Sequence, residues 1–445
     1  MIELSPIIND WPYDKALETY ASLADQPYAL FFDSSRLEHP LSQWSFIAWN
    51  PIETIESKNG IIKHNGITID ESDIFDFIQS RLNHYKVCLL QECSTPFYGG
   101  AAGYFGYDLG RQIEELPDQT NDDLNLPDCA IGIYTSVIAF DHKNKKGYLI
   151  CEENKEKPQL KETVASKNQP NVLWNNKTSD SDYKRHIQKI IDYIHAGEIY
   201  QANISRRFDA DLPKNFNTFQ HYLYLRSINS SPFSTFMNFG EFQLASCSPE
   251  RFITLKNDEI ETRPIKGTLP SYQKAEELKN SKKDNAENLM IVDLLRNDIS
   301  KVCMPHSVKV SSLCNVETFE GLHHLVSTIK GNLKQNENAA TLLKACFPGG
   351  SITGAPKIRA MEIIEELEPT RRGPYFGAMG YIGFNGNMDT NIIIRTIIYK
   401  DGKAYLQTGS GIVSDSKPAQ ELQEGLDKAQ KIFESFNPTK KEDAA

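Results

Sequence analysis

Clustered apolar positions in the first third of the chain predict a β-rich region. Residues 28–35 (YALFFDSS) and 45–51 (SFIAWNP) place short apolar runs between Asp, Ser and Pro, which is typical of strands bounded by turns. A helix is predicted over residues 73–86. The segment 98–108 (YGGAAGYFGYD) combines glycines with aromatic residues. Because no helix opens directly after it, we interpret it as a tightly packed strand and not as a phosphate-binding loop.

The rest of the chain alternates between helical and strand patterns. Residues 152–180 are rich in Lys, Glu, Asn and Pro, which is typical of a linker. After them, apolar residues at helical spacing predict a helix that starts after Asp182 and ends before Gly197. A strand is predicted at 199–208 and a β-rich segment up to about 330. Further helices are predicted at about 283–298, at about 338–346, behind a Gly-rich loop to about 366, and at 418–435, with two strands before the last helix.

These patterns predict how the chain is divided. We expect an N-terminal β-rich domain (1–150), a linker (151–180), a second domain that carries the chemistry (181–436) and a tail (437–445).

Two pairs of segments in different parts of the chain are similar to each other. GAAGYFGYD (100–108) is similar to GAMGYIGFN (377–385), and residues 128–140 are similar in spacing to residues 389–401. The insertions between the paired segments differ in length. An old duplication and a chance similarity therefore both remain open.

Composition and charge exclude several classes of protein. The 445 residues are 40% hydrophobic and 24% charged, as in ordinary globular proteins, and the mean hydropathy of -0.46 argues against a membrane protein. The chain has no apolar run of spanning length and no secretory signal pattern, so we expect a cytoplasmic protein. The net charge of -11 disfavours nucleic acid as the main partner. The eight cysteines are scattered, without zinc spacing, and reduced thiols are expected.

Lys266 has an unusual setting within SPERFITLKNDEIETRPIKGT (248–268). Pro264 fixes the approach to it, Gly267 allows backbone or ligand to come close, and Glu250 begins a strand that we expect to pair back onto this one. An amine beside a carboxylate can act as a nucleophile next to a general acid/base when burial keeps it partly neutral. The alternative is a hairpin with a structural ion pair.

Two predicted helices carry paired carboxylates. Asp284 and Glu287 are three residues apart and share one helix face, and Glu421 and Glu424 repeat this spacing with Lys428 one turn later. Carboxylate oxygens on two helices are suitable ligands for Mg²⁺. Each pair alone is more often a solvated acidic face.

Two glycine-rich loops are candidates for binding anions. FPGGSITGAPK (347–357) lacks the Lys and Ser/Thr of a phosphate loop, but its backbone N–H groups suit a carboxylate at a helix start. GSG (409–411) is a second such turn, and Arg395 is a candidate bidentate clamp. His324 is as compatible with a buried structural histidine as with a catalytic one.

Together these segments closely resemble the chorismate-utilising enzymes. The resemblance implies an α+β fold in which antiparallel β-sheets packed with helices enclose a deep active site, as in anthranilate synthase component I. It spans essentially residues 180–436 and is carried by SPERF (248–252), RPIKGT (263–268), AENLMIVDLLRND (286–298), HHLVST (323–328), FPGGSITGAPKIRAMEIIEELEP (347–369), GYIGFNGNMDTNIIIRT (380–396) and TGSGIVSDS (408–416).

The resemblance also implies a metal. Glu287 and Glu424 would bind Mg²⁺ directly, with Asp284 and Glu421 supporting it through water, and the metal would hold the ring carboxylate of chorismate. Family members commonly have Glu where Asp284 stands.

The resemblance implies further contacts with substrate. Lys266, Glu250 and His324 are the candidate catalytic residues. Thr268 and Ser351 would line the ring beside His324. The residues implied in holding the substrate carboxylates are Tyr381, Arg395, Gly409, Gly411 and Lys428, with the enolpyruvyl carboxylate chiefly at Arg395 and Gly411.

Two positions separate the branches of this family. Water-adding members carry a lysine base at the position of Gln201, which argues against isochorismate or salicylate synthesis. Anthranilate-forming members usually have Ala where Lys266 stands. The lysine implies amination at C4, in which Lys266 attacks C2, Glu250 protonates the departing C4 hydroxyl, and ammonia then expels the lysine. The product, 4-amino-4-deoxychorismate, leads to 4-aminobenzoate and folate. The alternatives are anthranilate formation and a non-catalytic chorismate- or tryptophan-binding regulatory subunit.

The resemblance implies partners as well. No Gly-x-Cys-x-Gly elbow of a glutaminase is present, so a separate glutamine amidotransferase subunit is implied as the source of ammonia. The N-terminal half is similar to a family domain that holds tryptophan in some relatives near a Leu-Leu-Glu-Ser motif. The matching residues are Phe31, Phe32, Asp33 and Ser34. Ser34 is the candidate contact, and the departure from the motif leaves tryptophan binding open.

Overall fold

Two large β-sheets form the centre of the protein. The computed structural model describes residues 2–89, 94–153, 155–166, 169–319 and 322–437. The sheets pack face to face through a core that includes Leu30 and Phe46 of one sheet and Ala102 and Met379 of the other. Apart from a short parallel pair, β1 (Ile2–Leu4) with β8 (Tyr85–Val87), the strand pairs of the described residues are antiparallel.

The first sheet has the spatial order β13 (Asn175–Asn176), β14 (Gln201–Asp211), β26 (Lys403–Ile412), β25 (Thr396–Lys400), β16 (Phe242–Ser248), β15 (Phe233–Asn238), β3 (Ala29–Asp33), β4 (Trp44–Ala48), β11 (Val137–Asp141), β12 (Lys146–Cys151) and β2 (Ile7–Trp11), with β22 (Gly354–Ala355) beside β14.

The second sheet has the order β19 (Ile265–Pro270), β21 (Leu322–Asn332), β18 (Glu259–Thr262), β17 (Arg251–Lys256), β24 (Met388–Ile392), β23 (Ala378–Gly383), β9 (Gly100–Phe105), β10 (Cys129–Tyr134), β5 (Glu53–Lys58), β6 (Ile61–His64) and β7 (Ile67–Ile69), with β20 (Lys309–Phe319) beside β21.

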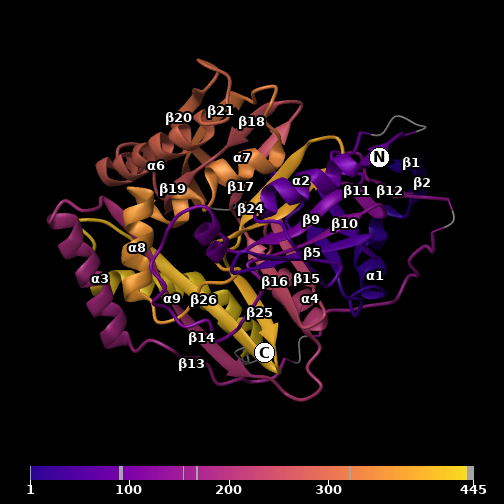
Figure 1. Ribbon diagram of the computed structural model, residues 1–445. Helices are drawn as coiled ribbons and strands as arrows, with labels where there is room; N and C mark the ends of the chain where they lie inside the picture. The colour runs from indigo at the N-terminus through magenta and orange to yellow at the C-terminus, as the bar shows by residue number, and fades with distance from the viewer. Residues whose placement is uncertain (1, 90–93, 154, 167–168, 320–321, 438–445) are drawn as a thin grey trace.

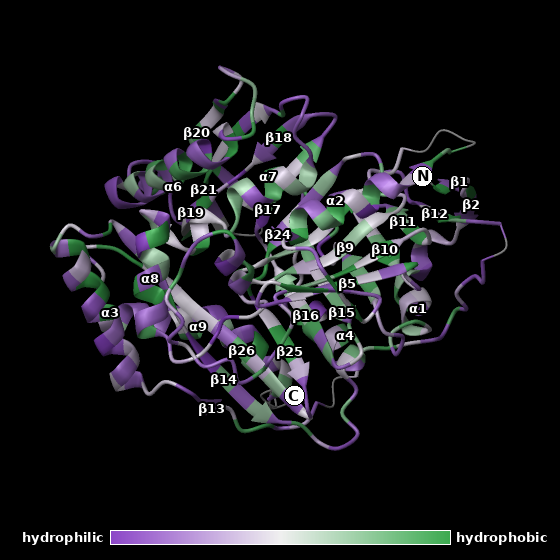
Figure 2. Cartoon of the chain, viewed as in Figure 1, coloured by the Kyte–Doolittle hydropathy of each residue, from purple (hydrophilic) through white to green (hydrophobic). Residues whose placement is uncertain are grey.

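Helices cover the outer faces of both sheets (Figure 1). On the first sheet, Tyr222 and Ile432 belong to the same core as Phe236, and on the second, Ile291 and Leu342 belong to the same core as Ile253. Figure 2 shows that α3 is largely hydrophilic, as expected of a helix with one exposed side. The helices are η1 (Tyr13–Lys15), α1 (Ala16–Ala21), α2 (Ile74–His84), η2 (Tyr107–Gln112), α3 (Asp180–His195), α4 (Thr218–Ile228), α5 (Ala275–Lys279), α6 (Lys282–Ser300), α7 (Ala339–Cys346), η3 (Gly350–Ile352), α8 (Lys357–Leu367) and α9 (Pro418–Phe436).

This mixture of helices and antiparallel sheets confirms the predicted α+β fold. The helices α2, α6, α7, α8 and α9 match the predicted ranges closely. The start of α3 was predicted too late: Ser179 is the N-cap, since its side chain accepts from the Asp182 N–H, and Asp182 lies in the first turn. The predicted hairpin was wrong in its pairing, because β17 pairs with β18 while the strand of Lys266, β19, pairs with β21.

The two halves of the chain repeat one succession of strands. In the N-terminal half, β3 and β4 lie in the first sheet, the strands up to β9 and β10 lie in the second, and β11 and β12 lie in the first again. In the C-terminal half, β15 and β16, the strands up to β23 and β24, and then β25 and β26 follow the same succession. The similar segments lie at corresponding places, and β9 pairs with β23 so that Gly103 is opposite Gly380. This arrangement supports an old duplication over a chance similarity.

The same pairing bears on how the chain is divided. Strands from before residue 150 and after residue 181 share both large sheets. The domain boundaries stay a prediction. Between β12 and α3 the described residues contain one short regular element, β13.

The cysteines of the described residues are free. Cys93 and residues 438–445 of the predicted tail lie outside the described residues.

Replacing Gly103 by alanine should destabilise the protein by about 3 kcal/mol, because two strands approach too closely for a side chain. A Cβ atom there would lie 2.1 Å from the carbonyl oxygen of Ala130. Gly386→Ala is the matched control, since no atom lies within 4 Å of its Cβ position, and only its left-handed backbone should cost about 1 kcal/mol. Thermal unfolding of both variants checks this, and equal shifts of Tm would exclude the close strand approach as the cause.

Candidate functional site

A cavity of about 860 Å³ is lined by residues of β19, β21, β26, α6 and α9, among others. It collects side chains and backbone that are widely separated in the sequence. The predicted site residues that line it are Glu250, Lys266, Asp284, Glu287, His324, Ser351, Arg395, Gly409, Gly411, Glu421, Glu424 and Lys428.

A bulge in β19 brings Lys266 towards α6. The register of β19 on β21 shifts between Lys266 and Thr268, and Gly267 at the shift has a φ of +72°. A Cβ atom at Gly267 would lie 2.9 Å from Cγ of Asp284. Glycine is therefore required for the first turns of α6, which carry Asp284 and Glu287, to pack against the strand of Lys266.

The protonation states of Lys266 and Glu250 are shifted in the directions that acid–base catalysis needs. Burial lowers the pKa of Lys266, although the carboxylates of Glu287 and Glu250 oppose this shift. Burial raises the pKa of Glu250, opposed by a hydrogen bond from Ser351 Oγ to its Oε1 (2.9 Å). The amine is thus shifted towards its neutral, nucleophilic form and the carboxyl towards its proton-donating form.

The carboxylates of α6 and α9 face the same cavity. Burial raises the pKa of Glu287 and of Glu421, and Asp284 raises the former further while Glu424 raises the latter. Ser416 Oγ donates to Glu421 Oε1 (2.7 Å), and Glu424 Oε1 lies 2.7 Å from Lys428 Nζ. Crowded carboxylates that disfavour their own charge suit a divalent cation.

These carboxylates do not form a closed cage by themselves. Among the residues that the structure describes, no three His, Cys, Asp or Glu side chains lie close enough to hold a metal ion. The donor set fits Mg²⁺, which takes oxygen ligands and keeps places for water and substrate oxygens.

Arg395 brings a guanidinium group to the lining of the cavity. Arg395 follows β24 with a left-handed φ of 50°, and its backbone carbonyl accepts from the Cys247 N–H (3.1 Å). Burial lowers the pKa of Arg395 and of His324, and Arg395 and then Arg36 lower that of His324 further. The cavity therefore brings the carboxylates of α6 and α9 together with the guanidinium group of Arg395.

The glycines of β26 lie where strands approach closely. A Cβ atom at Gly409 would lie 2.0 Å from the carbonyl oxygen of Ile204, and one at Gly411 would lie 2.5 Å from Gln201 Nε2. Lys428 Nζ donates to the Gly409 carbonyl oxygen (3.2 Å). Substitution of Gly409 would push the backbone of β14 away, whereas substitution of Gly411 would displace the Gln201 side chain.

Tyr381 does not line this cavity, and the expectation for it needs correction. Its ring lies in the core between the sheets, stacked on Phe97 with 4.5 Å between ring centroids and in edge contact with Phe46. The tyrosine that does line the cavity is Tyr375, in the turn before β23. The sequence resemblance pointed to Tyr381 on β23, whereas the tyrosine in the cavity is Tyr375 in the turn before that strand.

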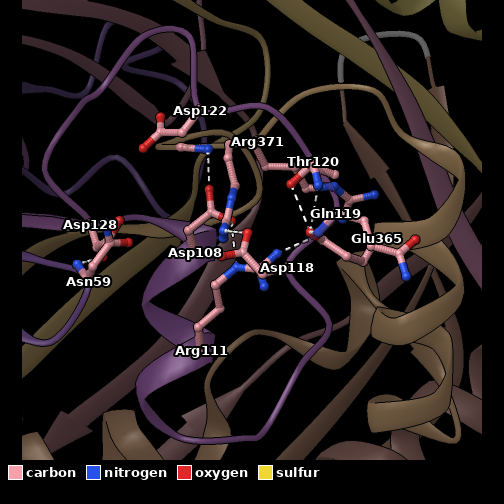
Figure 3. A network of polar contacts seen from close by, with 12 residues as sticks. Asn59, Asp108, Arg111, Asp118, Gln119, Thr120, Asp122, Asp128, Glu365 and Arg371 are labelled. Carbon is pink, nitrogen blue, oxygen red and sulfur yellow. Dashed lines mark hydrogen bonds and ion pairs between the residues drawn. The ribbon is translucent and has the colours of Figure 1, made fainter.

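A network of polar contacts holds the turn that carries Tyr375 (Figure 3). Asp108 Oδ2 accepts from the Gly373 N–H (2.7 Å), and its Oδ1 accepts from Arg371 (3.4 Å). Glu365 on α8 is bound by Arg111 and by the Thr120 N–H (2.9 Å). Asp108, after β9, therefore holds the turn at residues 371–373, and Arg111 and Thr120 hold the C-terminal end of α8.

Two other expectations are only partly met. Of the loop 347–357, Ser351 and Ile352 line the cavity, while Gly354 and Ala355 pair with β14. The start of α8 is not among the cavity-lining segments. The backbone of Thr268 pairs with that of His324. The Thr268 side chain is not among those that the structure describes.

Several residues that line the cavity were not predicted from the sequence. Arg36 and His39, in the loop between β3 and β4, line the cavity, and Asn203 on β14 does too. The turn residues around positions 34–42 mark this loop in the sequence, but no spacing pattern connects it with residues two hundred positions away.

A second cavity of about 540 Å³ lies between the sheets and includes Ser34, Trp44 and Tyr381 in its lining. Ser34 Oγ donates to the carbonyl oxygens of Trp44 (2.7 Å) and Pro232 (3.2 Å). Asp33 accepts from Tyr222 (2.9 Å) and is paired with Arg226, so it braces α4.

Comparison with known proteins agrees with this geometry. The model of the chorismate binding enzyme family matches residues 28–434. The chain is 40% identical to aminodeoxychorismate synthase component 1 of Escherichia coli (strain K12), over 98% of this chain and 100% of that protein. It is 35% identical to anthranilate synthase component 1 of Acetivibrio thermocellus, over 89% and 87% of the two chains.

A solved structure has the same fold. Anthranilate synthase component I from Streptococcus pneumoniae TIGR4 superposes with a TM-score of 0.79 at 34% identity, covering 89% of this chain and 93% of that one.

None of the helices in the described residues combines the length and the apolar character that crossing a membrane requires.

Proposed function

The chain belongs to the family of chorismate-binding enzymes, and from this premise we propose that it converts chorismate and ammonia to 4-amino-4-deoxychorismate. This is the activity of aminodeoxychorismate synthase component 1, and its product leads to 4-aminobenzoate and folate. One observation carries the choice of C4 over C2: a partly buried lysine, Lys266, lines the same cavity as Glu250.

The reaction divides into two displacements. Neutral Lys266 Nζ forms a bond to C2 of the ring, the two ring double bonds shift, and the C4–O bond breaks as Glu250 gives its proton to the leaving hydroxyl, which departs as water. Ammonia then forms a bond to C4, the double bonds shift back, and the C2–N bond to Lys266 breaks. The Glu250 carboxylate takes up the proton that the new amine loses, and the enolpyruvyl group stays attached throughout.

The cavity residues orient chorismate for these steps. Arg395 and the backbone of Gly411 hold the enolpyruvyl carboxylate, and Ser351 and His324 lie against the ring. Tyr375 replaces Tyr381 as the tyrosine that contacts substrate. Support comes from their common place in the lining of one cavity.

Enzymes of this family are generally Mg²⁺-dependent, and we place the ion at Glu287 and Glu424, with Asp284 and Glu421 binding it through water. Bound there, Mg²⁺ would hold the ring carboxylate of chorismate and would offset the negative charge of these carboxylates. The raised pKa values of Glu287 and Glu421 support this assignment.

The direct test is incubation of the protein with chorismate, Mg²⁺ and ammonium salt, followed by identification of the product. We expect 4-amino-4-deoxychorismate. Anthranilate as the product would favour the anthranilate synthase activity instead, and absence of any product would favour a regulatory subunit.

The isolated chain should use ammonium salts but not glutamine. The name "component 1" of the relatives implies a second component, and we propose that a separate glutamine amidotransferase supplies the ammonia. Because ammonia and not ammonium is the nucleophile, product formation should rise with pH at a fixed ammonium concentration. Steady-state assays with each nitrogen source check this. Glutamine use by rigorously purified protein would mean that the chain contains a glutaminase site.

The second cavity supports tryptophan as a further ligand. Its lining combines the aromatic side chains of Trp44, Phe46 and Tyr381 with Ser34, which suits an indole ring and a polar backbone portion. Asp33 is committed to α4 through Arg226, so tryptophan would rely on Ser34 and not on the acidic residue before it.

A further inference from the structure

The loop between β3 and β4 brings side chains from the N-terminal part into the catalytic cavity. Arg36, His39, Pro40 and Leu41 are part of its lining. They come from the half of the chain to which no catalytic residue has been assigned, and the inference below rests on the proposed function.

The loop is fixed by its own hydrogen bonds and by β15. The hydroxyls of Ser35 and Ser234 lie 2.6 Å apart, and Ser35 Oγ also donates to the Ser231 carbonyl oxygen (3.3 Å). Within the loop, the His39 N–H donates to the Arg36 carbonyl oxygen (3.1 Å), and the Ser42 N–H to that of His39 (2.9 Å). The side chains of Arg36 and His39 are thus presented by an ordered turn, which lowers the entropy lost when a ligand binds.

His39 is held in one tautomer. The Leu41 N–H donates to His39 Nδ1 (3.2 Å), so the neutral ring carries its proton on Nε2. Burial, with Arg36 and then His324, lowers the pKa of His39 to about 4. At neutral pH the ring is therefore an uncharged N–H donor.

Arg36 adds a further guanidinium group to the lining of the cavity. Burial lowers its pKa, Glu38 opposes this shift, and Arg395, which lines the same cavity, adds to it. Cations that are brought together in a desolvated cavity are stabilised when an anion binds between them.

Chorismate has two carboxylates, and the cavity lining holds both the carboxylates of α6 and α9 and the guanidinium groups of Arg36 and Arg395. The ring carboxylate is assigned to Mg²⁺ at Glu287 and Glu424, which leaves the enolpyruvyl carboxylate for the guanidinium groups. We propose that Arg36 and Arg395 hold the enolpyruvyl carboxylate together, from opposite halves of the chain, and that His39 Nε2–H donates to the same carboxylate.

The test compares chorismate with its analogue esterified at the enolpyruvyl carboxylate. Binding is measured by calorimetry with Mg²⁺ and without ammonia, and KM and kcat are measured with ammonium. Arg36→Ala should raise the Kd and KM for chorismate about 10- to 100-fold with little change in kcat, since a charge-assisted contact is lost. The wild-type preference for chorismate over the ester should fall by the same factor, and Arg36→Lys should restore part of it.

Matched variants keep the result interpretable. Glu38→Gln, an exposed change in the same loop, should leave KM unchanged, and thermal unfolding checks that each variant is folded. His39→Phe should also reduce the preference for chorismate over the ester. Wild-type protein that binds no chorismate would refute the proposed function. If wild-type binds, then an unchanged KM in Arg36→Ala, or equal losses for chorismate and ester, would overturn this inference.

Discussion

Replacing Lys266 by alanine should lower formation of 4-amino-4-deoxychorismate by orders of magnitude while chorismate still binds. Direct replacement of the C4 hydroxyl by ammonia is difficult, and a covalent relay divides it into two displacements of the same kind. The lowered pKa of Lys266 makes the amine available for this role. Without it, residual amination should move to C2 and give anthranilate. Separation of the products by chromatography measures both.

Lys256→Ala is a suitable control, because Lys256 is an exposed lysine at the end of β17. It should keep the wild-type rate and product. Formation of 4-amino-4-deoxychorismate at the wild-type rate by Lys266→Ala would show that Lys266 is only a structural cation.

Replacing Glu424 by glutamine should abolish activity at limiting Mg²⁺ and restore part of it when Mg²⁺ is raised. The exchange removes one charged ligand from a site with few carboxylates, and the apparent Mg²⁺ affinity should fall about 100-fold. It also deprives Lys428 of the partner at 2.7 Å, so substrate binding should weaken too. Titration of activity with Mg²⁺ measures the first effect.

Glu434→Gln on the same helix is the matched control. Glu434 pairs with Lys431 (2.9 Å) and does not line the cavity. The activity of the Glu434→Gln variant should therefore depend on Mg²⁺ in the same way as that of the wild-type. Normal turnover by Glu424→Gln at limiting Mg²⁺ would contradict the metal assignment.

Local patterns predicted the helices of the site well. The carboxylates of α6 and α9 face one cavity as their spacing implied, because helical periodicity is a local property. The helix α4 was missed, since Phe219, Tyr222 and Tyr224 are aromatic residues that also favour strands. Its N-cap, Asn217, was the available signal.

Strand order was beyond local reasoning. Glu250 and Lys266 were expected to converge through a hairpin, but β18 and β21 lie between β17 and β19 in the sheet. The two residues meet at a cavity formed where the strands end and α6 begins. Arg36 and Tyr375 were missed for the same reason: segments far apart in the sequence place them, and no short pattern encodes long-range pairing.

The pairing of β9 with β23 has a consequence for the synthesis of the chain. Residues 106–377 separate the two strands, so β9 leaves the ribosome tens of seconds before its partner at roughly 5–20 residues per second. During that time its edge, which is buried in the finished protein, is available to other chains. Nascent chains that end before β23 are therefore the species most prone to aggregate, and chaperones should engage this protein during translation and not after it.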